Sequence, residues 1–291
     1  MSTFQPGTDQ RYALLEGTNV HDVPIPMIGL GTWPMTGAQC HDAVASALAA
    51  GYRHLDTAEN YANEDAVGRA VLGSGIPREE VFVTSKFNRQ WHGGTESVRT
   101  ALEAGLERAG LEYFDLFLVH WPNPDQNRYV QSCESLAALV ETGLIRSWGV
   151  SNFSPAHLQA VLDAGLVPAV NQVYCEPEDA QRPAQEANTA AGVLTAAYTP
   201  IGRGSGLLQN PVITGVASRL GRTPAQVVLR WHVQQGRIAI PKSADPRRQR
   251  ENLDVFSFEL SAEDTAAIDA LDVSASGGKS PGRADPEVFG H

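Results

Sequence analysis

Short apolar runs alternate with amphipathic stretches along the 291-residue chain, and this rhythm constrains the fold most strongly. The runs are rich in Val, Ile, Leu and Phe, and the stretches between them have helical spacing, which is typical of repeated strand–helix units. The predicted strands are 26–31, 53–57, 81–86, 114–120, 145–151, 169–172, 193–198 and 238–242. Eight such units predict an α/β fold of the (β/α)8 kind, a TIM barrel.

The predicted helices carry ordinary start and stop signals. Ser154-Pro155 and Thr223-Pro224 each pair an N-cap residue with a proline at the first helical position. Glycines that would end helices just before the next strand are Gly51, Gly110, Gly143 and Gly165.

No break in composition divides the chain, so we expect one domain over residues 1–291. Residues 1–25 are expected to form a hairpin that plugs the barrel, and 274–291 a C-terminal tail. A doubly wound sheet is the rival architecture, but G-x-G-x-x-G is absent. Pro34 takes the third glycine position after Gly29 and Gly31, and Arg78 takes it after Gly73 and Gly75.

The net charge of the chain limits the kinds of partner that it can bind. A net charge of −11 argues against binding to nucleic acid or to an anionic membrane surface, because both need many Lys and Arg residues. The cysteines Cys40, Cys133 and Cys175 show no metal or disulfide pattern. The N-terminus lacks the features of a signal peptide, and no apolar stretch reaches transmembrane length. We therefore expect a cytoplasmic protein, and a monomer.

Polar residues stand where the predicted strands end. In a barrel these positions share one rim, which is where catalytic groups of such folds lie. The rim positions are Asp56, followed by Tyr61 in the next loop, then Lys86, His120, Ser151, Asn152, Gln172, Tyr198, Lys242 and Ser243.

Five segments resemble motifs of the aldo-keto reductases. They are Leu55-Asp56-Thr57-Ala58 with Tyr61, Thr84-Ser85-Lys86, Val119-His120-Trp121-Pro122, Gly149-Val150-Ser151-Asn152-Phe153 and Ile240-Pro241-Lys242-Ser243. They occur in the family's order, and the short loops resemble those of prokaryotic members such as diketogluconate reductase-like enzymes. The resemblance implies a barrel, NADPH as cofactor, a small carbonyl compound as substrate, and a catalytic tetrad of Asp56, Tyr61, Lys86 and His120.

The tetrad suits carbonyl reduction. An alkoxide formed by hydride transfer needs a proton donor, which the resemblance assigns to Tyr61. An ammonium at Lys86 is expected to lower the pKa of Tyr61, and Asp56 would pair with that ammonium. His120 is expected to donate a hydrogen bond to the carbonyl oxygen.

The resemblance also assigns the cofactor site. Lys242, Ser243 and Arg248 would bind the 2′-phosphate of NADPH, with Asn252 near the adenine; Tyr198 would stack on the nicotinamide. Further cofactor contacts are expected from Thr32, Asp56, Ser151, Asn152, Gln172, Thr199, Ile201 and Arg203.

The substrate pocket is expected to be aromatic and open. Its predicted walls are Trp33, Phe87, Trp91, His120 and Trp121. The loop 122–127 is short, and Tyr174 and Glu176 stand where relatives often have Glu and His, which puts the local rim geometry in doubt.

Other interpretations stay open at this stage. Alone, Asp56 could be a helix cap, His120 a core histidine, and Arg248 part of a solvated helix face. An NADPH-sensing regulatory subunit on the same fold is the alternative function. A metal-dependent hydrolase would need ligand spacings such as HxH or HExxH, which the sequence lacks, so no metal is expected.

Overall fold

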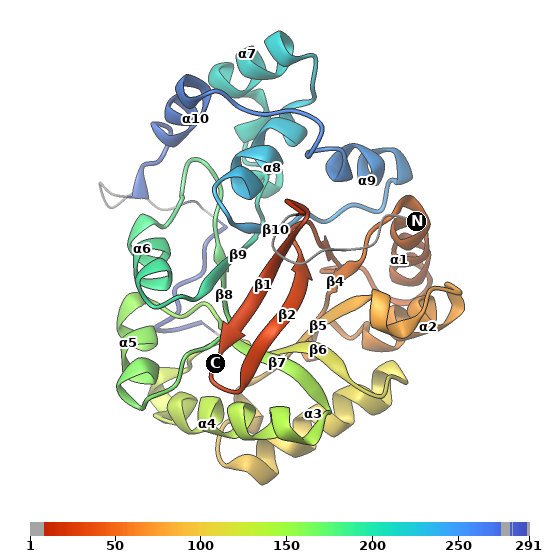
Figure 1. Cartoon of the computed structure of the whole chain (residues 1–291), viewed down its shortest axis with the longest axis vertical. Helices are drawn as coiled ribbons and strands as arrows, with labels where there is room; N and C mark the ends of the chain where they lie inside the picture. Colours follow the sequence, from red (N-terminus) through yellow and green to blue (C-terminus); the bar gives the residue numbers. More distant parts are fainter. Residues whose placement is uncertain (1–8, 275–279, 281, 290–291) are drawn as a thin grey trace.

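The computed structural model describes residues 9–274, 280 and 282–289. Its main sheet has eight parallel strands surrounded by helices (Figure 1). The strands are β3 (Leu30–Gly31), β4 (His54–Asp56), β5 (Phe82–Phe87), β6 (Phe114–Val119), β7 (Ile145–Ser151), β8 (Val170–Tyr174), β9 (Leu194–Tyr198) and β10 (Ile238–Ile240). Neighbours in the sheet follow chain order from β3 to β10, so the doubly wound alternative, in which strand order reverses, is wrong.

The first and last strands meet and nearly close the barrel. Ile28 forms a parallel bridge with Ala239, and the backbone N–H of Gly29 donates to the carbonyl of Ala239 at 2.9 Å. The Gly31 N–H donates to the carbonyl of Pro241 at 3.0 Å. The predicted TIM barrel is confirmed.

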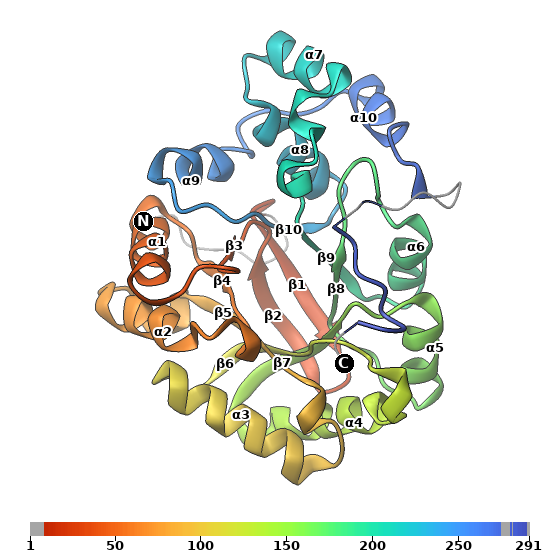
Figure 2. The same cartoon turned by 180° about the vertical axis from the view of Figure 1, so that it is seen from behind.

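The helices pack around the outside of the sheet, as Figures 1 and 2 show from opposite sides. They are α1 (Gly37–Ala50), α2 (Glu64–Gly73), α3 (Thr95–Ala109), α4 (Tyr129–Leu139), α5 (Pro155–Asp163), α6 (Arg182–Ala190), α7 (Pro211–Leu220), α8 (Pro224–Gln234), α9 (Pro246–Leu253) and α10 (Ala262–Asp269). The predicted caps Ser154 and Thr223 both form capping boxes at α5 and α8.

An antiparallel hairpin of β1 (Tyr12–Gly17) and β2 (Val20–Pro26) covers one end of the barrel. Leu15, Val20 and Ile25 are buried against the barrel core. The Trp148 indole N–H of β7 donates to the carbonyl of Thr18 in the hairpin turn at 2.8 Å. The hairpin expected from the N-terminal sequence is present, and residues 1–8 of that prediction lie outside the described part.

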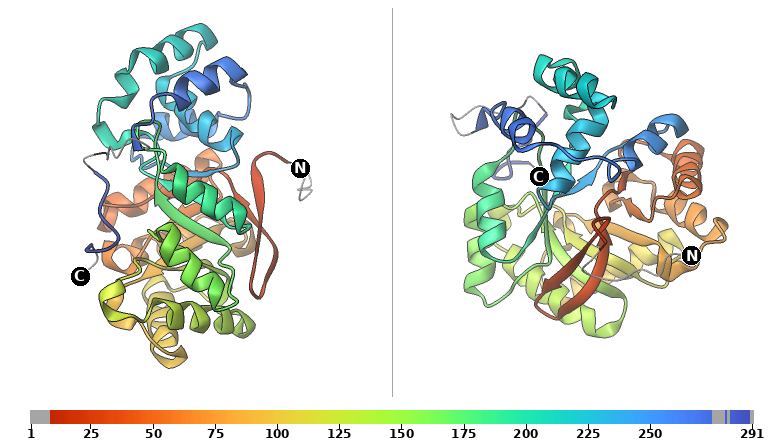
Figure 3. Two further views of the ribbon diagram at one scale, coloured as in Figure 1. Left: turned by 90° about the vertical axis from the view of Figure 1, so that its left-hand side faces the viewer. Right: turned by 45° about the horizontal axis from the view of Figure 1, so that its top comes forward.

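The last described residues lie at the other end of the barrel, opposite the hairpin (Figure 3). This is the end at which the strands of the main sheet finish, so the C-terminal segment and the polar strand ends share one face. Of the predicted tail 274–291, residues 275–279, 281, 290 and 291 lie outside the described residues.

Strand boundaries differ from the predictions by one or two residues at most positions. The predicted strand 238–242 ends as β10 at Ile240, because Pro241 has no N–H to continue the ladder. The predicted strand 26–31 is reduced to two residues, and its first residue, Pro26, belongs to the hairpin strand β2.

Candidate active site

Four side chains from three neighbouring strand ends meet at the rim. The Lys86 Nζ lies 2.7 Å from Asp56 Oδ1 and donates to the carbonyl of Thr57 at 2.9 Å. Tyr61 comes from the short helix η1 (Glu59–Tyr61) after β4, and the Lys86 Nζ lies 5.1 Å from the centre of its ring. The Tyr61 and His120 rings lie edge to face with centres 5.8 Å apart. The structure therefore brings the predicted tetrad together.

Burial decides the protonation of this cluster. Lys86 is fully buried, and burial lowers its pKa while the Asp56 carboxylate opposes that shift. Burial, together with the charge on Lys86, lowers the pKa of His120 well below 6.5, so the ring is neutral at pH 7.

The expected electrostatic effect on Tyr61 is wrong for this structure. Burial raises the pKa of Tyr61 well above 10, and the Asp56 carboxylate raises it further. The physical reason is that a buried phenolate would lose its hydration and would lie near the negative charge of Asp56, and both effects favour the neutral phenol. Tyr61 is thus firmly held in the protonated form.

Several side chains predicted to contact the cofactor lie beside the tetrad and form hydrogen bonds with protein groups. The Gln172 Nε2 donates to Asp56 Oδ2 at 2.7 Å, and the Ser151 hydroxyl donates to the carbonyl of Gln172 at 2.9 Å. The Tyr198 hydroxyl donates to Asn152 Oδ1 at 2.9 Å, and Asn152 Nδ2 donates to the carbonyl of His120 at 3.0 Å. One hydrogen-bonded network therefore joins β4, β6, β7, β8 and β9.

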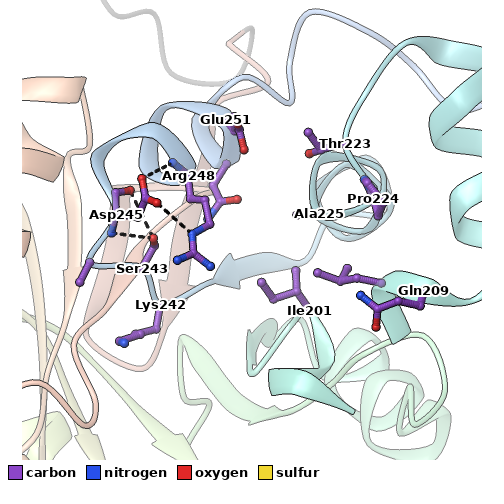
Figure 4. A pocket seen from close by; sticks show the side chains of 13 residues that line it. Ile201, Gln209, Thr223, Pro224, Ala225, Lys242, Ser243, Asp245, Arg248 and Glu251 are labelled. Carbon is purple, nitrogen blue, oxygen red and sulfur yellow. Dashed lines mark hydrogen bonds and ion pairs between the residues drawn. The ribbon is translucent and has the colours of Figure 1, made fainter. Parts of the chain in front are cut away.

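A cavity of about 590 Å³ lies beyond β10 and the start of α9 (Figure 4). Its lining includes the predicted phosphate and adenine residues Lys242, Ser243, Arg248 and Asn252, together with Ile201. Asp245 also lines it; this carboxylate caps α9 by accepting from the Arg247 and Arg248 N–H groups and lies 3.4 Å from the Arg248 Nε. The cavity therefore combines two exposed cationic side chains, Lys242 and Arg248, with the positive end of a helix, which suits an anionic group.

The other predicted cofactor residues are spread along the rim. The Thr32 hydroxyl donates to the carbonyl of Asp56 at 2.9 Å. Thr199 follows β9 with a positive φ of 55°. The Arg203 guanidinium lies 4.0 Å from the centre of the Trp33 ring, so the loop after β9 reaches the loop after β3.

Aromatic side chains form only part of the predicted substrate pocket. Trp33 is 42 % exposed at the rim, and Trp121 packs against Phe289 of the C-terminal segment with ring centres 4.6 Å apart. The Trp91 indole N–H donates to Glu59 Oε1 at 2.8 Å. Phe87 was predicted to line the pocket and does not.

Alternation along β5 explains the error at Phe87. Lys86 faces the barrel interior, so its neighbour faces outward toward the helices. Phe87 is 1 % exposed and packs against His92 and Phe117 in the core.

Sequence reasoning missed the anchoring of the C-terminal segment. The Ser280 hydroxyl donates to Glu176 Oε1 at 2.6 Å, its N–H donates to Asp179 Oδ2 at 2.8 Å, and Arg283 pairs with Asp179 at 2.9 Å. Glu176, which stands where relatives often have His, thus holds the C-terminal segment against the rim.

A second cavity of about 360 Å³ lies beneath this segment, beside Asn152 and Tyr198.

Sequence reasoning also missed two polar residues beside His120, Glu59 and Asn88. Asn88 Oδ1 lies 3.2 Å from the His120 Nδ1, and Asn88 Nδ2 donates to Glu59 Oε2 at 3.1 Å. No pattern in the sequence marks this pair, since the two residues lie on different rim loops.

The described residues contain neither a membrane-spanning helix nor a cluster of metal ligands. None of their helices is long and apolar enough to cross a membrane. Within the same residues, no cluster of three or more His, Cys, Asp or Glu side chains could hold a metal ion.

Comparison with known proteins gives consistent matches. The aldo/keto reductase family profile matches residues 27–273. An aldo-keto reductase of Mycolicibacterium smegmatis is 45 % identical over 260 residues, covering 88 % of this chain and 93 % of the relative. Methylglyoxal reductase DkgA of Yersinia pestis is 41 % identical, with 91 % and 94 % covered. The crystal structure of a Gox0644 mutant in complex with NADPH superimposes with a TM-score of 0.86 at 37 % identity, with 95 % and 98 % covered.

Proposed function

Because the chain belongs to the aldo/keto reductase family and is therefore an oxidoreductase, we propose that it reduces an aldehyde or ketone to an alcohol with NADPH. The observation that carries the proposal is the buried Lys86–Asp56 ion pair beside the phenol of Tyr61. A buried ion pair is costly to form, and here it lies next to a group that can donate a proton.

The fit of the cofactor rests on the cavity next to α9. A 2′-phosphate needs positive charge and hydrogen-bond donors, and Lys242, Ser243 and Arg248 offer both in this cavity. NADPH, when bound, supplies the hydride for the carbonyl carbon. The NADPH complex of the Gox0644 mutant supports the choice of this cofactor.

Tyr61 would donate its hydroxyl proton to the carbonyl oxygen. Its raised pKa is compatible with this step, because it keeps Tyr61 protonated at neutral pH and an alkoxide is a stronger base than a phenolate. As the proton leaves, the Lys86 ammonium would stabilise the phenolate that remains. Asp56 would hold that ammonium at 2.7 Å throughout.

Two classes of substrate form the first panel. Methylglyoxal is suggested by the name of the Yersinia relative, and an aromatic aldehyde by the rim side chains Trp33 and Trp121. With either substrate the carbonyl oxygen must come within hydrogen-bond reach of the Tyr61 hydroxyl.

The test is a direct assay of the purified full chain. NADPH oxidation should depend on the carbonyl compound, and mass spectrometry should identify the matching alcohol. Absence of turnover with the whole panel, despite tight NADPH binding, would contradict the proposal and favour the NADPH-sensing alternative.

We also propose that the chain forms one domain. In support, the barrel pairs Ile28 near one end of the chain with Ala239 near the other, and the segment 282–289 contacts the rim through Phe289 and Arg283. Limited proteolysis should then give no stable fragment that retains only some of the strands.

A further inference from the structure

Gln249 of α9 is fully buried where that helix packs on α1. Its Nε2 donates two hydrogen bonds, both at 2.9 Å, to the carbonyl of Ala43 in α1 and to the carbonyl of Ser243. Both partners are backbone carbonyls, which only accept hydrogen bonds, so the group that faces them is the amide NH2. One side chain thus ties the segment after β10, which lines the cavity next to α9, to a neighbouring helix.

The oxygen of the same amide has no partner. Gln249 Oε1 is buried and accepts no hydrogen bond from any group in the described part of the chain. A buried acceptor without a partner lowers stability, and an apolar side chain of similar size would avoid that loss. Unpaired buried groups of this kind are typical of positions that serve a site. The role of this amide therefore lies with the two carbonyls that its Nε2 holds.

The contact with Ser243 sets the direction of the next backbone N–H. The peptide bond from Ser243 to Ala244 is trans, and in a trans peptide the C=O and N–H groups point in opposite directions. Since the Ser243 carbonyl points at Gln249, the Ala244 N–H points away from it. Ala244 lines the cavity, and among the residues that the structure describes this N–H has no acceptor. It is therefore available to an anion in the cavity.

The start of the same segment is held independently of α9. The Gly31 N–H of β3 donates to the carbonyl of Pro241 at 3.0 Å. Lys242, the next residue, is therefore anchored through β3 whether or not the Gln249 amide is present. Loss of that amide would free only the peptide that follows Ser243.

We propose that Gln249 is a positioning residue for the cofactor, which holds the Ser243 carbonyl so that the Ala244 N–H faces the 2′-phosphate of NADPH. This role rests on the proposed function for its cofactor, and it belongs to a side chain that does not line the cavity. A donor that is already oriented loses little conformational freedom when the anion binds, whereas a freed peptide must be ordered at that moment. Loss of the amide should therefore weaken NADPH binding about three- to tenfold and leave NADH, which lacks the 2′-phosphate, unchanged.

The variant Gln249→Met isolates this role. Methionine is apolar and of similar volume, so it removes the two hydrogen bonds and the unpaired oxygen together while the helix packing is kept. Adenosine 2′,5′-bisphosphate and adenosine 5′-monophosphate differ only in the 2′-phosphate, so they report that contact without turnover. In calorimetric titrations, the wild type should prefer the bisphosphate. In Gln249→Met this preference should fall about three- to tenfold.

Gln226→Met is the matched control. Gln226 is also a buried glutamine, and its Nε2 donates to the carbonyl of Asp254, just after α9, at 2.9 Å. The same substitution therefore loosens the other end of α9 without touching the segment after β10, and the preference should keep its wild-type value. A merely structural contribution of Gln249 would weaken both nucleotides equally. Equal losses in Gln249→Met, or the same fall in preference in Gln226→Met, would overturn the positioning role.

A complex of the wild type keeps the test decisive if Gln249→Met does not fold. In a crystal structure with adenosine 2′,5′-bisphosphate, we expect the Ala244 nitrogen within hydrogen-bond distance of a phosphate oxygen while the Ser243 carbonyl stays on Gln249. A turned peptide, with that carbonyl released, would overturn the proposal.

Failure of the cofactor assignment is distinguishable from failure of this role. A wild type with equal affinity for the two nucleotides would refute NADPH as the cofactor of the proposed function, and the role of Gln249 with it. A wild-type preference that Gln249→Met retains in full would refute the role of Gln249 alone.

Discussion

Replacing Arg248 by alanine tests the assignment of the cofactor phosphate. Arg248 lines the cavity next to α9, and its side chain is 66 % exposed with Nε 3.4 Å from Asp245 Oδ2. A hydrogen bond to a charged group contributes about 1.5–3 kcal/mol. Because Arg248 is exposed and shares its charge with Asp245, the lower end applies, or about a tenfold loss in affinity for NADPH. NADH lacks the 2′-phosphate, so its affinity should hardly change.

The chain provides a matched control in Arg247. It lies on the same helix and is 72 % exposed, but it pairs with Glu251 and does not line the cavity. Arg247→Ala removes the same charge from the helix, so it reports the general loss of positive potential. Titration of NADPH and NADH into the wild type and both variants, followed by tryptophan fluorescence, gives the six dissociation constants that are needed. Repeating the titrations at higher salt should shrink the preference for NADPH, since the site is exposed to screening.

Three results would refute the assignment. Equal losses for NADPH and NADH would mean that Arg248 contacts another part of the nucleotide. An equal effect of Arg247→Ala would reduce the contact to general electrostatics. No loss at all would return Arg248 to a solvated helix face.

Three further predictions follow from the rim and the core. Tyr61→Phe should lower kcat about 10²- to 10⁴-fold with NADPH affinity unchanged, and a near-normal kcat would exclude Tyr61 as the proton donor. Burial lowers the pKa of His54 to about 4, so its neutral form is stabilised by folding, and stability should fall by about 3 kcal/mol as the pH drops from 6.5 to 4. Denaturant melts of the wild type and His54→Gln should show a weaker acid dependence in the variant; parallel curves would exclude His54 as the cause. Ser280→Ala removes the hydrogen bond to Glu176 and should speed amide exchange in 282–289 about tenfold by mass spectrometry, with exchange in β6 as the unchanged reference.

The barrel could be predicted because its signals are local. Each strand is an apolar run and each helix carries caps that a short window of sequence contains, as Ser154 and Thr223 show. The rim followed from the same reasoning, since parallel strands finish at one edge. That reasoning places Asp56, Lys86 and His120 together from the sequence alone, and in the structure they lie together.

The sequence predictions were wrong where the outcome depended on the direction in which a side chain points or on the electrostatic environment of a buried group. Phe87 was predicted to line the pocket as one of several aromatic side chains near the rim, but alternation along β5 turns it into the core. The pKa of Tyr61 was expected to fall because Lys86 is nearby. Burial of the phenol and the nearby Asp56 carboxylate, both tertiary features, raise the pKa instead.

The sequence by itself therefore determined the order of strands, the barrel and the residue types at its rim, because these depend on periodicity and on neighbours along the chain. Only the tertiary structure decided which partner each polar group has. Ser280 meets Glu176 across 104 residues, and Asn88 joins Glu59 to His120 across loops 29 and 32 residues apart. Such pairings depend on how separate loops approach one another after the barrel has formed, and no local pattern of residues encodes that approach.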